Sequence, residues 1–113
     1  MMKKMFLLLG IILSLALIQG HAPSDLEISF DSEELVLTLV VTHQVGNPTN
    51  HHVRTIRVYE GGRELVVQEL SRQDDTGSVT LLYRLPGAQA GMVLTVEAEC
   101  NRVGTLSQEF IIE

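Results

Sequence analysis

The 113-residue sequence has one cysteine, no tryptophan, five other aromatic residues (two Tyr and three Phe) and a deficit of positive charge. A single cysteine excludes an internal disulfide, and with it the small folds that disulfides hold together. The net charge of -6 argues against a nucleic-acid-binding protein, which needs a basic face for phosphates. A hydrophobic content of 45% excludes a wholly disordered chain. The length allows one small domain.

The first 20 residues differ in character from the rest. Lys3 and Lys4 precede an almost unbroken apolar run from Met5 to Ile18, and small residues follow. This is the layout of a secretory signal peptide. The run of 14 residues is shorter than the roughly 20 that cross a bilayer, which disfavours the alternative of a retained membrane anchor. We therefore expect residues 1–20 to be a signal peptide.

Removal of this segment changes the composition of what remains. We expect cleavage before His21, or after Ala22, where the following Pro23 is unfavourable. Residues 21–113 then form one domain with six Arg, fourteen Asp and Glu and no Lys, a net charge of -8. The expected location is the periplasm or the extracellular space, with membrane contact only during export.

Apolar and polar residues alternate with a period of two through most of residues 21–113, which predicts strands that are buried on one face. Gly61-Gly62 separates two such segments and predicts a tight hairpin turn. Seven short strands without a helical segment favour an all-β, immunoglobulin-like β-sandwich, with a small barrel as the alternative. The predicted strands are 25–30, 34–43, 52–60, 63–70, 78–85, 92–100 and 106–112.

Residue types that carry chemistry are scarce, apart from four histidines and the cysteine. His43 ends one predicted strand and the pair His51-His52 begins the next, so the three should lie at one end of the fold. Imidazoles with a nearby thiolate suit a transition metal. Two alternatives remain: histidines on loops that bind nothing, and Cys100 as a buried apolar thiol on the core face of its strand. Strict alternation places His52 on the same face as Ile56.

Two short motifs resemble a known family. The stretch from Thr49 to Tyr59, which reads TNHHVRTIRVY, is similar to the superoxide reductase (neelaredoxin and desulfoferrodoxin iron domain) segment His-His or His-Tyr, Ile, two residues, Ile, Glu, Leu. Cys100-Asn101 with Gly104 resembles the family's Cys-Asn-x-His-Gly. The resemblance covers roughly residues 35–112.

The resemblance implies an immunoglobulin-like sandwich that holds one ferrous iron between four histidines in a plane and a cysteine thiolate below it, with an open position for superoxide. By position, His43, His51 and Cys100 match ligands of the family. His51 is preferred to His52 because the first histidine of the pair is the family's ligand. His21, in His21-Ala22-Pro23, is a weaker match to the family's His-x-Pro ligand.

The sequence departs from the family pattern at three points. Val103 stands where the family has the second histidine of Cys-Asn-x-His-Gly, and valine cannot bind a metal. The family's lysine beside the first ligand is absent, and the loop from His43 to His51 is two residues longer. A net charge of -8 would also repel an anion. A complete five-ligand iron site then requires His52 or another group as a substitute.

Three functional hypotheses follow. The first is an exported superoxide reductase-like domain with a His/Cys site for iron, or for copper or zinc, supplied with electrons by a redox partner protein. The second is a non-catalytic binding module, similar to the immunoglobulin-like partner protein of sulfur-carrying thiosulfate oxidation systems. The third is a copper-handling protein in which His21, as the N-terminal residue, chelates copper through its amine and imidazole. No residue pattern marks an oligomeric interface.

Overall fold

The computed structural model describes residues 20–113, so the expected signal peptide lies outside the described residues except for Gly20. The described part is all-β, and within it no helix is long and apolar enough to span a bilayer. The seven strands are β1 (Asp25–Asp31), β2 (Val36–Thr42), β3 (Val53–Glu60), β4 (Arg63–Glu69), β5 (Ser78–Arg84), β6 (Val93–Cys100) and β7 (Thr105–Ile111). All seven predicted strands are present, and no end differs from the prediction by more than two residues.

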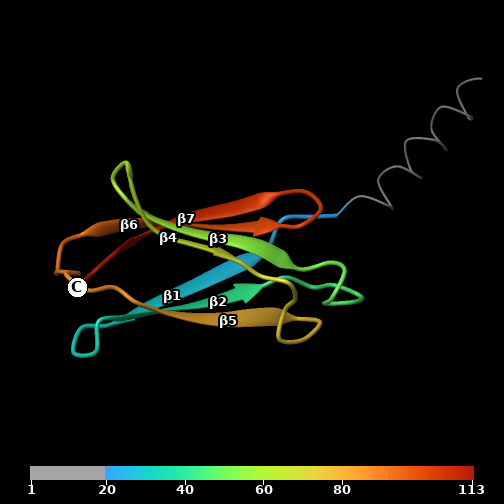
Figure 1. Ribbon diagram of the computed structural model, residues 1–113, viewed down its shortest axis with the longest axis horizontal. Coiled ribbons are helices and arrows are strands. Elements are labelled where there is room, and N and C mark those ends of the chain that lie inside the picture. Colours follow the sequence, from blue (N-terminus) through green and yellow to red (C-terminus); the bar gives the residue numbers. More distant parts are fainter. Residues whose placement is uncertain (1–19) are drawn as a thin grey trace, which may run out of the picture.

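The strands form two antiparallel sheets that face each other (Figure 1). One sheet has the order β1-β2-β5 and the other has the order β4-β3-β6-β7. This arrangement confirms the predicted immunoglobulin-like sandwich. The β3–β4 hairpin turns at Gly61, whose φ of 59° is a conformation that glycine adopts without strain.

The core lies between the sheets and is built by alternation along the central strands. In β2, Leu37, Leu39 and Val41 are fully buried, and the residues between them are partly exposed. In β6, Leu94 and Val96 point inward, and Cys100 continues the same face to the end of the strand. Burial of this apolar surface is the main stabilising contribution to the fold.

Two strand details differ from the prediction. β2 begins at Val36 rather than at residue 34, because Leu35 has a φ of 59° and ends the turn before the strand. In β3, Val53 pairs with Cys100 but Thr55 pairs with Glu99, so Arg54 is an extra residue, a β-bulge. The bulge shifts the alternation, and Val53 joins Ile56 in the core.

The prediction that His52 shares a face with Ile56 was therefore wrong. Strict alternation assumes one residue per position on each strand, and the bulge at Arg54 adds one. Val53 occupies the core side at this end of β3, and His52 precedes the strand.

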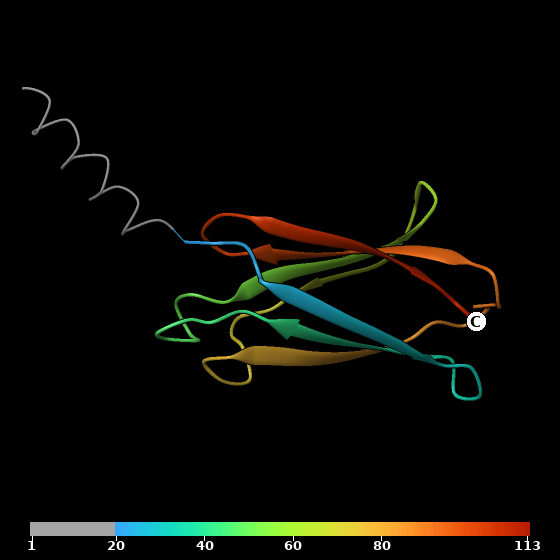
Figure 2. The same ribbon diagram turned by 180° about the vertical axis from the view of Figure 1, so that it is seen from behind.

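One end of the sandwich gathers segments that are distant in the sequence. The chain entering β1 and the β2–β3, β4–β5 and β6–β7 loops all lie at this end, in the views from both sides (Figures 1 and 2). We call it the histidine rim, because His21, His43, His51 and His52 all belong to these segments.

Substitution of central core residues should reduce stability. Leu39→Ala or Ile56→Ala removes a fully buried side chain and should lower the free energy of unfolding by about 2–5 kcal/mol, as measured by urea denaturation. Leu82, which is 64% exposed, provides the control, since Leu82→Ala should change stability by only about 0.5 kcal/mol or less. Equal losses for all three variants would contradict the assigned core.

Candidate metal site

Three imidazoles meet at the histidine rim. The ring centroids are 4.7 Å apart for His21 and His43, 4.9 Å for His43 and His51, and 5.2 Å for His21 and His51. Each of the three residues offers one ring nitrogen, and these three nitrogens all lie within 4.8 Å of one another. Converging imidazole nitrogens are a common donor set for zinc, copper, iron and nickel. The structure thus brings together three of the five residues that the sequence nominated.

His21 is exposed and reaches the cluster through a close backbone contact. The adjacent residue Ala22 lies against Gly104, where an added Cβ would be 2.6 Å from the Ala22 nitrogen. Gly104 also has a φ of 101°, so glycine is needed here for two reasons. The His21 Nδ1 lies 3.1 Å from the Ala22 carbonyl oxygen, which can only accept, so Nδ1 carries the proton and Nε2 is free to bind a cation.

His43 is fully buried directly after β2, where its backbone N–H donates to the Gly77 carbonyl. Its Nδ1 lies 2.6 Å from Gln73 Oε1, and its Nε2 lies 2.9 Å from the His21 carbonyl oxygen. Both neighbours accept protons, and a neutral imidazole has only one to donate. A metal ion bound at Nε2, with a small shift of the His21 carbonyl, would remove this conflict.

His51 is held by a turn in which its backbone N–H donates to the Asn47 carbonyl. Its side chain is buried, and Nε2 has no hydrogen-bond partner among residues 20–113. Burial, followed by the positive charge of Arg102 and the neighbouring imidazoles, lowers the pKa of His51. The fold therefore favours the neutral ring, which is the form that binds metals. An orphaned buried nitrogen beside two other imidazoles fits a metal ligand.

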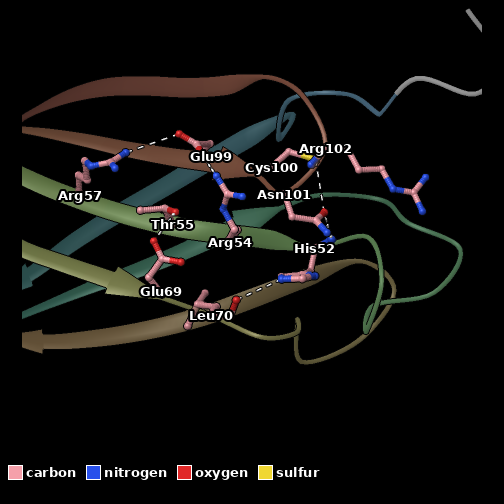
Figure 3. A network of polar contacts seen from close by, with 10 residues as sticks. All are labelled: His52, Arg54, Thr55, Arg57, Glu69, Leu70, Glu99, Cys100, Asn101 and Arg102. Atoms are coloured by element: carbon pink, nitrogen blue, oxygen red, sulfur yellow. Dashed lines mark hydrogen bonds and ion pairs between the residues drawn. The ribbon is translucent and has the colours of Figure 1, made fainter.

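His52 is equally buried but belongs to a different contact (Figure 3). Its Nε2 donates to the Leu70 carbonyl oxygen at 3.1 Å, and its Nδ1 has no hydrogen-bond partner among the described residues. The backbone N–H of His52 donates to Asn101 Oδ1, and the backbone N–H of Asn101 donates to the carbonyl oxygen of His52. His52 is outside the group formed by His21, His43 and His51.

Cys100 is buried and free at the end of β6 (Figure 3). It pairs with Val53, two residues after His51, and its Sγ accepts the backbone N–H of Arg102 at 3.4 Å. Within residues 20–113, however, the converging donor group contains the three imidazoles and not Sγ. Val103 is 50% exposed and supplies no donor.

Gln73, which no sequence motif marks, is 1% exposed and contacts both His43 and Val53. It lies in a polar loop between Arg72 and Asp74, where no spacing or periodicity distinguishes it from its neighbours. Asn101 belongs to the quoted Cys-Asn motif, but its bonds to the backbone of Asn50 and His52 were not foreseen.

Comparisons with known proteins show the fold alone. No family model and no curated protein matches the sequence. Among solved structures, the chain is similar to the superoxide reductase (1Fe-SOR) from Giardia intestinalis, with 18% sequence identity and a TM-score of 0.57. The match covers 83% of this chain and 99% of the Giardia chain. At this identity the likeness establishes a common β-sandwich architecture with that superoxide reductase.

Proposed function

We propose that this domain binds one transition-metal ion through Nε2 of His21, His43 and His51. The observation that carries the proposal is the buried, unpartnered His51 Nε2 next to two imidazoles. Nδ1 of His21 lies 3.1 Å from a carbonyl oxygen and Nδ1 of His43 lies 2.6 Å from an amide oxygen, so with its ring proton on Nδ1 each residue can present Nε2 as a lone pair. A ligand histidine whose other nitrogen donates to an oxygen is the usual arrangement at metal sites.

Iron is the metal we propose. The structural neighbour is a one-iron superoxide reductase, and histidine ligands with open positions suit non-haem iron. Three imidazoles alone would also suit zinc with a fourth ligand. A copper chelate at an N-terminal His21 would need its Nδ1, which here donates to the Ala22 carbonyl. The geometry therefore favours binding through Nε2 over the copper chelate.

We further propose that the Cys100 thiolate is an additional ligand. The pairing of Cys100 with Val53 places it beside the segment that carries His51, and its Sγ accepts the backbone N–H of Arg102. Bound iron would supply one-electron redox chemistry, with electrons delivered by a partner protein. The chain's part is to bury and orient the imidazoles and to place the Arg102 charge beside them.

The N-terminal sequence supports a role outside the cytoplasm. Two lysines followed by a 14-residue apolar run favour export, and cleavage before His21 would leave His21 to reach the site from the new N-terminus.

The adjacent pair His51 and His52 provides a matched test of the metal site. The purified protein should bind one equivalent of Co(II), and His51→Gln should weaken binding by more than about 100-fold, the upper end of the loss seen for residues behind the ligands. His52→Gln should leave the affinity near that of the wild type, because His52 contacts Leu70 instead. Equal losses, or no Co(II) binding by the wild type, would refute the assignment.

The thiolate ligand has a separate spectroscopic test. Iron-loaded, oxidised protein should show a visible thiolate-to-ferric charge-transfer band, and Cys100→Ala should lose the band while it keeps bound iron through the three imidazoles. A spectrum that Cys100→Ala leaves unchanged would show that the metal is bound without sulfur.

Export is tested by mass spectrometry of the protein after expression with its native N-terminus. The mass should correspond to a chain that begins at His21 and is found outside the cytoplasm. Leu13→Arg, which breaks the apolar run, should leave an uncleaved chain inside the cell. A full-length chain in the membrane fraction would instead indicate a retained anchor.

A further inference from the structure

The buried side chain of Gln73 connects three parts of the histidine rim. It lies in the β4–β5 loop and is 1% exposed. Its amide Nε2 donates to the carbonyl oxygens of His43 at 3.0 Å and of Asp75 at 3.2 Å. Its Oε1 accepts the backbone N–H of Val53 at 3.0 Å and faces His43 Nδ1 at 2.6 Å.

These contacts fix the orientation of the amide. If the amide were flipped, its NH2 group would face the Val53 N–H, and its oxygen would face two carbonyl oxygens. Three of the four contacts would become repulsive, and in a buried position each would cost free energy. The group beside His43 Nδ1 is therefore an oxygen acceptor, and it requires a proton on Nδ1.

In its uncharged form, which is the form that binds metals, His43 has one ring proton and two acceptors compete for it. Gln73 Oε1 lies at 2.6 Å and is fully buried, so it has no access to solvent as an alternative. The His21 carbonyl lies farther away, at 2.9 Å, and belongs to an exposed residue. The competition favours the Nδ1–H form, which leaves the Nε2 lone pair directed toward His21.

We infer that Gln73 is the positioning residue that sets the tautomer of His43 and so keeps its Nε2 available as a donor atom. Gln73 also holds Val53, two residues after His51, so one side chain restrains the segments that carry two of the three imidazoles. The tautomer assignment stands on the contacts of Gln73 alone. Its consequence for metal affinity rests on the proposed function.

Nitrogen-15 NMR of the metal-free protein reads the tautomer directly. His43 signals, assigned by their loss in His43→Gln, should show the proton on Nδ1. In Gln73→Met, which keeps the length of the side chain but removes the acceptor, the proton should move to Nε2, toward the His21 carbonyl. In Gln73→Glu, which keeps an oxygen acceptor, the Nδ1–H form should be restored.

Affinity for Co(II) provides the second readout. Gln73→Met should weaken binding by about 10–100-fold, as is typical for residues that orient metal ligands, and Gln73→Glu should recover much of the loss. Tyr83→Phe is the control, because it removes an intramolecular hydrogen bond, to Gln68, away from the three imidazoles. This variant should bind Co(II) as the wild type does.

The outcomes separate the two proposals. A wild-type protein that shows the Nδ1–H form but binds no Co(II) would refute the proposed function and uphold the role of Gln73. An Nε2–H form in the wild type would overturn the inference, as would a folded Gln73→Met with unchanged tautomer and affinity. If Gln73→Met does not fold, the wild type and Gln73→Glu still decide, because both must show Nδ1–H.

Discussion

A buried imidazole nitrogen needs a partner, and the structure at the histidine rim depends on how that need is met. The β-sandwich brings together His43, which follows β2 of one sheet, and His51, which precedes β3 of the other sheet, and it buries both side chains. An unpaired buried polar atom costs about 1–3 kcal/mol, so His51 Nε2 is a local destabilisation unless something binds it. A metal ion is a partner that can satisfy several such nitrogens at once. Under the proposed function, the metal-free protein carries this cost and metal binding removes it.

The network around the cluster supports this interpretation. Gln73 restrains His43 from one side, and Asn101 ties the backbone of Asn50 and His52, on either side of His51, to the end of β6. The outer face of β3 and β6 has its own ion pairs, in which Glu99 binds Arg54 at 2.7 Å and Arg57 at 3.5 Å. Arg102 belongs to neither ion pair, and its positive charge lowers the pKa of His51. The histidine rim therefore contains a cationic side chain, although the domain as a whole is strongly negative.

Much of the fold could be predicted from the sequence because alternation reports which face of a strand is buried. The clear alternation from Leu37 to Val41 and from Leu94 to Cys100 identified β2 and β6 and the face that each of them buries. The position of His43 and His51 at one end followed from the strand order.

The bulge at Arg54 could not be predicted, because an inserted residue leaves no mark in composition and depends on pairing with β6. Gln73 could not be predicted because its role comes from contacts with residues 20 and 30 positions away. The separation of Cys100 Sγ from the imidazole group depends on side-chain geometry that spacing does not report.

Metal content is the measurement that tests the account most directly. The protein is purified without air and without added metal chelators, and its elemental composition is determined alongside its concentration. The account predicts one equivalent of a first-row transition metal per chain, with iron the expected element, retained through gel filtration. A folded protein that contains no stoichiometric metal, and takes up none when Fe(II) is supplied without air, would contradict it. The histidine rim would then be a set of buried polar residues in a sandwich whose function lies elsewhere.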